Sequence, residues 1–252
     1  MVKRDEIVEF INNYLEIQKF KDSGTNGLQV PGKEEVEKVV FGVSASLELF
    51  QQAVKKGADM IIVHHGLFWE GSRWRISYLL KGRLKFLFDN NLSLLGYHLP
   101  LDAHPEIGNN TQIAKRLGIK ITGKFGEYQG EAIGWEGIFQ TPKRFSGLVK
   151  EIKEIFGFKP WYLKSGKDIL KTVAVVSGGG AGIIPEVIDK KIDVYITGET
   201  REFIPQAAKE GGINYISAGH YNTEKFGIQA LGELLKEKFK IKVEFIDIPN
   251  PL

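Results

Sequence analysis

Residues 53–65, AVKKGADMIIVHH, align without gaps with residues 187–199, VIDKKIDVYITGE. Each stretch leads into a short apolar run typical of a buried strand. The run ends on a side chain that can bind a metal, His65 in one copy and Glu199 in the other. Because an internal repeat changes the prediction for the whole fold, this pair of segments is the starting point for the fold class.

A second pair of segments supports the repeat. LLGYHLPLD (94–102) aligns with ISAGHYNTE (216–224), which places His98 on His220 and an aspartate on a glutamate. The economical interpretation is an α/β protein of two related halves, an internal duplication in which mixed sheets are flanked by helices in three layers. In open α/β sheets the carboxyl ends of the strands bind ligands, and the matching polar residues fall there.

Strand-like runs are followed by helical patterns in both parts of the chain, which favours the α/β class. We expect a first half over residues 1–125 and a second half over residues 166–252. Between them, residues 126–165 are interpreted as a connecting subdomain. From residue 133 this stretch reads as a strand, a turn at Thr141-Pro142 and a helix.

Composition narrows the chemistry. The chain has no cysteine, so a metal would be held by His, Asp, Glu or water. The net charge of +3 is spread along the chain and is not the footprint of a dedicated nucleic-acid binder. No apolar run approaches the roughly 20 residues of a membrane span, and the N-terminus does not resemble a signal peptide. We therefore expect a cytoplasmic protein that contacts neither membrane nor nucleic acid.

All five histidines lie in three short motifs, VHHG (63–66), YHLPLDAH (97–104) and GHYNTE (219–224). Each motif has a structural alternative. One ring of the VHHG pair could cap the strand while the other fills surface or core. Pro100 in YHLPLDAH and Pro105 directly after it predict a rigid loop, in which Asp102 could cap backbone groups. Glu224 lies in the first turn of a predicted helix, where a carboxylate is favoured without any metal.

Together the motifs offer two adjacent histidines, a third histidine, an aspartate and a glutamate, which is a ligand set for two divalent ions. Two such ions bring about +4 and the two carboxylates about −2, so the site would favour an anionic substrate. Hydrolysis by metal-activated water is then the natural reaction class. Zn, Mn, Fe, Co and Ni all suit these ligands.

Two further features could bind a ligand but also have purely structural explanations. The glycine-rich loop at 177–182 follows a strand and could cradle phosphate, but it matches neither a dinucleotide-binding nor a P-loop pattern. A tight strand-to-helix turn explains it as well. Phe68, Trp69 and Trp74 could stack a base, although aromatic residues near a strand end are more often core or subunit contacts.

The sequence resembles the dinuclear-metal proteins of the GTP cyclohydrolase 1 type 2 homologue family, also called NGG-interacting-factor-like, in their short bacterial form. The likeness runs from TNGLQVPGK (25–33) to the closing FIDIPNP (245–251). It includes HHG, HLPLDAH and GHxxTE in this order. Two departures are Tyr221, where relatives often carry histidine, and Trp135, where many carry an arginine.

The resemblance implies two metal ions per subunit. His65 and Asp102 would hold one ion, and His64 and His220 the other, with Glu224 as the bridge. His98 and His104 are the candidate catalytic residues, which would relay protons. Glu199 would lie beside the ligands or the substrate.

The resemblance also implies a ring-like homohexamer. The function we expect is a metal-dependent hydrolase acting on a nucleotide or another small anionic molecule, with GTP ring opening as one form of it. The alternative is a non-catalytic protein that stores or delivers metal or regulates other proteins. Binding of DNA or RNA through a ring channel has little support in the sequence.

Overall fold

The structure, a computed structural model, describes residues 1–70 and 76–251. Its contacts divide the chain into two compact units. Unit 1 consists of Met1–Leu101 and Ile228–Pro249, and unit 2 consists of Asp102–Gly227 and the residues after Pro249. The boundaries between the units differ from the predicted ends of the two halves at residues 125 and 166. The predicted connecting subdomain, residues 126–165, lies inside unit 2. Trp74 lies outside the described residues.

Unit 1 is built on a five-stranded mixed sheet with the order β13-β4-β5-β6-β2, in which only the β2 edge is antiparallel. Its strands are β2 (Gly27–Val30), β4 (Lys38–Ser44), β5 (Met60–His65), β6 (Ser93–Gly96) and β13 (Lys242–Phe245). Its helices are α1 (Arg4–Tyr14), η1 (Ile17–Lys19), α2 (Leu47–Lys55), α3 (Tyr78–Asp89) and the part of α9 (His220–Phe239) from Ile228 on. A small ribbon pairs β1 (Val2–Lys3) with β3 (Glu35–Val36).

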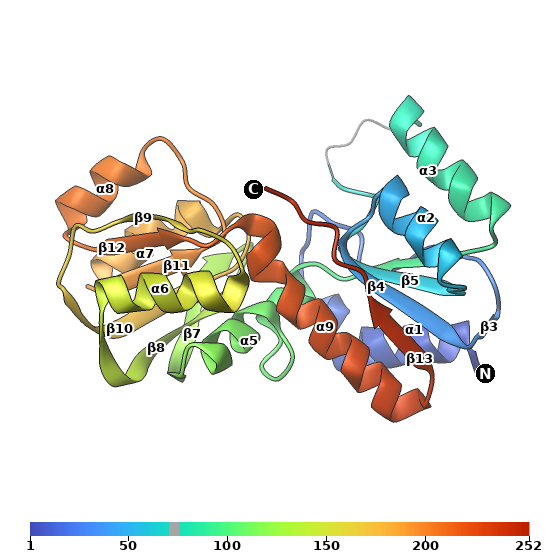
Figure 1. The fold of residues 1–252 in the computed structure, drawn as a ribbon, viewed down its shortest axis with the longest axis horizontal. Helices are drawn as coiled ribbons and strands as arrows, with labels where there is room; N and C mark the ends of the chain where they lie inside the picture. Colours follow the sequence, from blue (N-terminus) through green and yellow to red (C-terminus); the bar gives the residue numbers. More distant parts are fainter. Residues whose placement is uncertain (71–75, 252) are drawn as a thin grey trace. The chain divides into compact units, whose positions relative to one another are not determined.

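Helices cover both faces of the unit 1 sheet. Successive side chains of a strand point to opposite sides, so neighbouring residues of a strand pack against different helices. On β4, Val40 joins the core cluster that α2 and α3 form with the sheet. Its neighbour Phe41 packs instead beneath Gly232 of α9, where a Cβ would lie 3.2 Å from the ring. Unit 1 is therefore a sandwich of helices, sheet and helices (Figure 1).

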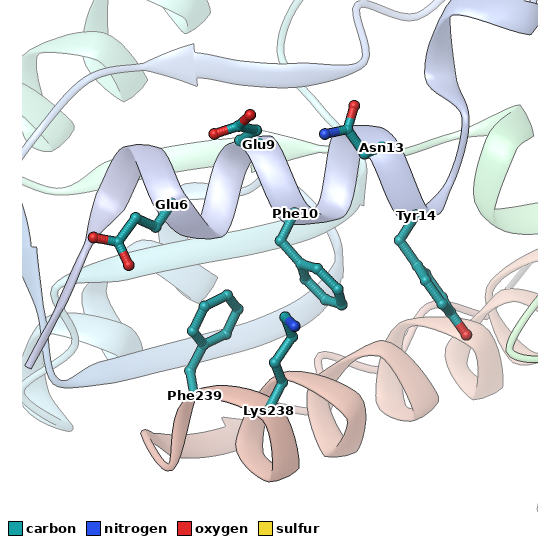
Figure 2. Close-up of a pocket in the computed structure, with 7 residues that line it drawn as sticks. All are labelled: Glu6, Glu9, Phe10, Asn13, Tyr14, Lys238 and Phe239. Atoms are coloured by element: carbon teal, nitrogen blue, oxygen red, sulfur yellow. The ribbon is translucent and has the colours of Figure 1, made fainter.

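The helices α1 and α9 meet through aromatic side chains within unit 1. Phe10 stacks on Tyr14 and contacts Phe239 edge to face, with ring centroids 5.6 and 5.5 Å apart. The ammonium of Lys238 lies 4.5 Å from the Phe10 ring centroid (Figure 2). With Glu6 on the flank, these side chains line a shallow surface pocket.

Unit 2 is built on a six-stranded mixed sheet with the order β7-β8-β10-β11-β12-β9. Its strands are β7 (Ile119–Tyr128), β8 (Glu131–Arg144), β9 (Trp161–Leu163), β10 (Ile169–Val176), β11 (Val194–Thr197) and β12 (Asn214–Ser217). Its helices are α5 (Asn109–Arg116), α6 (Phe145–Phe156), η2 (Gly180–Ile183), α7 (Ile184–Asp189), α8 (Ile204–Gly211) and the start of α9. The short helix α4 (Leu99–Ala103) spans the boundary between the units.

In unit 2, α5 and α6 pack on one face of the sheet in a single apolar cluster with β10, β11 and β12. On β11 the buried Tyr195 belongs to the other face, where its hydroxyl donates to the carbonyl of Gly180 in η2 at 2.6 Å. The predicted turn at Thr141-Pro142 is not present, because β8 runs through both residues. The register between β8 and β10 shifts there, and such an irregularity tolerates a proline that cannot donate a hydrogen bond.

The predicted duplication is present in the strand pairing. Val39 of β4 pairs with Met60 of β5, and Val173 of β10 pairs with Val194 of β11, as the first alignment requires. The antiparallel edges repeat too, because β2 pairs with β6 as β9 pairs with β12. Each unit, taken by itself, thus contains the same four-strand core.

One buried carboxylate in each unit repeats with its partners. Asp59 accepts hydrogen bonds from the amides of Glu37 and Lys38 at 2.9 and 3.1 Å and from the Lys33 ammonium. Asp193 does the same, and its partners are the aligned positions: the amides of Lys171 and Thr172, at 2.9 and 3.0 Å, and the ammonium of Lys167. Burial opposes ionisation of both carboxyls, but these partners outweigh it and lower both pKa values. An identical hydrogen-bond pattern at aligned positions is strong support for duplication.

The second predicted alignment is wrong by one residue. The amide of Tyr97 donates to Val63 at 2.9 Å, and the amide of Ala218 donates to Thr197 at 2.8 Å. Tyr97 therefore corresponds to Ala218, and His220 lies one residue further along the chain than the counterpart of His98. Within residues 1–70 and 76–251, no helix has the length and apolar character needed to cross a membrane.

Candidate metal centre

The adjacent histidines of VHHG end strand β5 and are held by its two neighbouring strands. His64 is fully buried, and its Nδ1 lies 2.8 Å from the carbonyl of Tyr97, which follows β6. His65 Nδ1 lies 3.0 Å from the hydroxyl of Ser44 on β4. A carbonyl only accepts hydrogen bonds, so Nδ1 of His64 carries the proton and Nε2 has the lone pair. The ring centroids are 4.7 Å apart, so neighbouring residues of one strand do face a common place.

The glycine after the histidines is required by a close contact with Gln29. A Cβ on Gly66 would collide with the Gln29 amide, and a Cβ on Gly96 would lie 2.7 Å from its Nε2. That amide donates to Thr25 O at 2.6 Å and accepts from the amide of Leu67 at 2.7 Å. The TNGLQV segment thus fixes the path of the chain beyond His65.

His98 faces the same place from the end of β6. Its ring centroid is 5.1 Å from that of His64 and 5.6 Å from that of His65. Each of the three rings offers one nitrogen, and the three nitrogens lie within 4.8 Å of one another. Trp69 forms a wall beside them, with its ring edge to face on His98 at 4.9 Å. We call His64, His65 and His98 the histidine cluster of unit 1.

A carboxylate that the sequence analysis did not single out orients His98. Asp22 Oδ1 lies 2.8 Å from His98 Nδ1, and Asp22 also accepts from the amides of Gly24 and Leu99 and from the side chain of Asn26. Burial raises the pKa of Asp22, but His98 and these donors outweigh it and lower the pKa to about 2. The ionised carboxylate only accepts, so the proton of His98 lies on Nδ1 and its lone pair on Nε2.

Asp102 lies in α4, a short helix where the sequence predicted a loop. Pro100 is the second residue of this helix, where its missing N–H breaks no bond. Oδ1 of the buried Asp102 carboxylate accepts hydrogen bonds from the amide side chain of Asn109 at 2.9 Å and from the hydroxyl of Ser177 at 2.8 Å. Asn109 in turn accepts from the amide of Gly227 at 2.7 Å, which fixes its orientation.

His220 and Glu224 lie one turn apart at the start of α9, as predicted. His220 Nε2 is 3.1 Å from Glu224 Oε2, and His220 Nδ1 is 2.6 Å from Glu199 Oε1. Burial lowers the pKa of His220, but the two carboxylates outweigh it and raise the pKa to about 9. Glu224 is 2% exposed, so its charge is held away from water.

The glycine-rich loop approaches this pair directly. Gly178 has a φ of +58°, its amide donates to Thr223 at 3.0 Å, and a Cβ there would collide with Glu224 Oε1 and lie 3.1 Å from His220 Nε2. Gly179, the next residue, has a φ of −77° and room for a Cβ. The amide of Gly178 is therefore used by Thr223, and the loop shapes the surroundings of Glu224.

His104 differs from the other four histidines. Its Nδ1 accepts hydrogen bonds from the backbone amides of Glu106 and Ile107 at 3.2 and 3.3 Å, so its proton lies on Nε2. This closes the turn before α5. Trp135, which stands where many relatives carry arginine, donates from Nε1 to Thr111 at 2.9 Å.

The predicted ligands thus form two groups, one in each unit. The hydrogen bonds described above that orient each group come from residues of the same unit. Unit 1 brings together His64, His65 and His98, while unit 2 pairs His220 with Glu224 and fixes Asp102 on its own network. Four of the five histidines have an oxygen atom as the hydrogen-bond partner of Nδ1, the arrangement that fixes the ring of a metal-binding histidine, whereas Nδ1 of His104 accepts from backbone amides. The imidazole and carboxylate donors suit a borderline divalent ion.

Asp22 and Ser44, which orient these donors, were not recognised in the sequence, and Ser177 was recognised there only as part of the glycine-rich loop. Asn109 could have been recognised as a candidate, because it closely follows HLPLDAH in a segment that the family resemblance covers. Ser44 had no such signal in the sequence, since its contact with His65 depends on the pairing of β4 with β5.

Comparison with known proteins agrees with this architecture. A protein of Archaeoglobus fulgidus named GTP cyclohydrolase 1 type 2 homolog is 44% identical over 247 residues, covering 98% of each chain. The solved structure of protein ybgI, described as of unknown function, superposes with a TM-score of 0.95 at 42% identity over the whole of both chains. TTHA1606 from Thermus thermophilus gives 0.91 at 37%, again over both whole chains. The family model for Duf34/NIF3 (NGG1p interacting factor 3) matches residues 2–251, and the chain belongs to that family.

Proposed function

We propose that this protein is a dinuclear metal protein whose ligands are His64, His65, Asp102, His220 and Glu224. The observation that carries the proposal is the way the histidines are held. Nδ1 of His64 faces the carbonyl of Tyr97, Nδ1 of His220 faces the carboxylate of Glu199, and Nδ1 of His65 lies beside the hydroxyl of Ser44, which orients the three rings as in metal-binding histidines. In the arrangement implied by the family resemblance, His65 and Asp102 would hold one ion, His64 and His220 would hold the other, and Glu224 would contribute to both.

The surroundings of Glu224 and Asp102 fit such ions. Both carboxylates are buried, with 2% and 4% of their surface exposed, and a buried negative charge is costly unless a cation compensates it. Gly178 leaves room beside Glu224 that any other residue would fill. Divalent ions at these donors would act as Lewis acids that activate water and stabilise negative charge.

The activity we propose is hydrolysis of a small anionic substrate, with a nucleotide as the first choice. Two ions bring about +4 against about −2 from Asp102 and Glu224, which favours an anion. The name of the relatives, GTP cyclohydrolase 1 type 2 homolog, points to a purine nucleotide, in which water would attack C8. Of the two histidines expected to move protons, His104 holds its proton on Nε2 and can donate it from there.

The test is a metal analysis combined with a panel of nucleotides and phosphoesters, applied to the wild type and to Glu224→Ala. Glu233→Ala is the matched control, because Glu233 lies on the same helix with its side chain 65% exposed. We expect the wild type and the control to contain metal and to turn over a member of the panel, and Glu224→Ala to lose both. Equal metal content and activity in all three proteins would refute the proposal. A wild type with exchangeable metal and no turnover would support metal storage or delivery instead.

The remaining parts of the proposal concern the assembly and the setting. We propose a homohexamer, as the family resemblance implies, in the cytoplasm. Exposed apolar side chains at the start of α3 offer a surface for subunit contacts: Ile76 is 67% exposed, Tyr78 95% and Leu79 63%. Light scattering on the purified protein measures the mass of the assembly, and a monomer would refute this part.

A further inference from the structure

The shallow pocket that α1 and α9 form on unit 1 combines aromatic rings with charges of both signs (Figure 2). We propose that it is a docking site for an arginine side chain of a partner protein. All residues that line the pocket belong to unit 1, and none is a proposed metal ligand, so the site goes beyond the proposed function. Its volume of about 470 Å³ is within the range of ligand sites.

Three half-buried aromatic rings line the pocket. Phe10 and Tyr14 lie one turn apart on α1 and stack, with ring centroids 5.6 Å apart and ring planes inclined by 25°. Phe239 of α9 meets Phe10 edge to face at 5.5 Å. The face of an aromatic ring carries partial negative charge and attracts cations. The three rings therefore offer apolar surface together with a place for a positive charge.

A cation of the chain itself already uses these rings. The ammonium of Lys238 lies 4.5 Å from the centroid of the Phe10 ring and 5.8 Å from that of the Phe239 ring. Within residues 1–70 and 76–251, Lys238 forms no ion pair with a carboxylate. Its contact with the rings shows that the pocket attracts a cation.

The same pocket is lined by two carboxylates that lack a cation. Glu6 and Glu9 lie three residues apart on α1, on one side of the helix, and both side chains are exposed. In the described part of the chain, neither forms an ion pair. Figure 2 shows both on α1, with Lys238 on α9. Two carboxylates and one ammonium leave an excess of negative charge, which complements a positively charged partner.

Arginine fits this combination of groups better than lysine or a small free cation. Its planar guanidinium stacks on an aromatic face and donates parallel hydrogen bonds to a carboxylate, whereas an ammonium acts as a point charge. Its aliphatic stem can cover apolar ring surface. Because the pocket is shallow, it would leave much of a small free ligand in water, so the occupant should bring further surface with it. An arginine on a protein partner does so, and arginine is enriched among the anchors of interfaces.

Lys238 is a competitor for this site. Its ammonium occupies the ring face that the guanidinium needs, and the two positive charges repel each other. Lys238 is exposed and is the last residue but one of α9, so it can turn into solvent and loses only its contact with the rings. An exposed contact of this kind corresponds to about a two- to fivefold change in a binding constant. Removal of the ammonium should therefore strengthen binding, whereas a purely structural role of Lys238 predicts no gain.

The test is an NMR titration of the full chain, with ¹³C in its phenylalanine rings, against N-acetyl-arginine methylamide. The signals of Phe10 and Phe239 are assigned by replacing each residue with leucine. N-acetyl-citrulline methylamide, which has the same shape and no charge, is the matched control ligand. We expect the arginine probe to shift both signals with an affinity in the millimolar range. Absence of these shifts, or equal binding of the citrulline probe, overturns the proposal. Tighter binding of N-acetyl-lysine methylamide overturns the assignment to arginine.

Variants of the lining residues test the same site. Lys238→Met should bind the arginine probe about two- to fivefold more tightly than the wild type. Glu6→Gln/Glu9→Gln should weaken binding by roughly 2- to 30-fold at low salt, because it removes two exposed ion pairs.

Glu34→Gln/Glu37→Gln is the matched control variant. It changes the net charge equally at exposed residues of unit 1 that do not line the pocket, and it should keep the affinity of the wild type. The proposal is wrong if Lys238→Met shows no gain in affinity, or if the control variant loses as much affinity as Glu6→Gln/Glu9→Gln. Thermal melting of each variant shows that it is folded.

Discussion

Gly178→Ala tests the glycine-rich loop without replacing any proposed ligand. An alanine at a φ of +58° lies in the left-handed region, which costs roughly 1–2 kcal/mol. The new methyl group also collides with Glu224 Oε1. The loop cannot retreat easily, because the Gly178 amide donates to Thr223 and its carbonyl accepts from Gly198, both at 3.0 Å. The carboxylate of Glu224 must therefore move.

The size of both effects follows from these contacts. In a chain of this length 1 kcal/mol corresponds to about 2–4 °C in Tm, so the backbone strain alone lowers Tm by roughly 2–8 °C. Displacing a ligand oxygen by more than about 0.5 Å disrupts a metal site, so we expect metal content to fall well below that of the wild type. Metal-free samples of both proteins should differ in Tm only by the backbone strain and the contact of the methyl group with Glu224.

The assays are thermal unfolding by circular dichroism and elemental analysis of protein purified without added metal. Gly179→Ala is the control, because its φ is −77° and the nearest atom to its Cβ lies at 3.9 Å. We expect wild-type Tm and metal content in the control. If Gly178→Ala keeps the metal content of the wild type, Gly178 does not shape the metal centre and the reasoning fails.

Three further predictions concern stability and the metal. Asp59→Ala and Asp193→Ala should each cost at least about 3 kcal/mol in urea unfolding. Each change removes two charge-assisted hydrogen bonds from backbone amides, of roughly 1.5–3 kcal/mol each, as well as the contact with a lysine ammonium. A cost below about 1 kcal/mol in either would refute the duplicated role. Because the fold lowers both pKa values, this stability is full above about pH 4 and is lost as the pH falls through the folded pKa, so acid unfolding of either variant should be less pH-dependent than that of the wild type. Removal of metal with a chelator should lower the wild-type Tm, and the same treatment should leave Glu224→Ala unchanged; equal shifts would contradict the ligand role of Glu224.

Local patterns were enough to predict the fold class. Short apolar runs such as MIIVHH predict buried strands, and the helical patterns after them predict helices. Both signals depend only on residues that are neighbours in the sequence. The duplication was visible because Asp59 and Asp193 keep the same sequence distance to their strands. The register of the second pair of segments could not be predicted in the same way. It depends on the hydrogen bonds of Tyr97 and Ala218 to neighbouring strands.

The sequence by itself determined the donor atoms of the candidate site: five histidines in three motifs, with a carboxylate in two of them, at the ends of strands or the start of a helix. The tertiary structure alone decided how each donor is held and aimed. Asp22 reaches His98 across 76 positions and Ser177 reaches Asp102 across 75, and no local pattern encodes such contacts. Strand pairing and loop packing bring these residues together and fix the orientation of the imidazole rings.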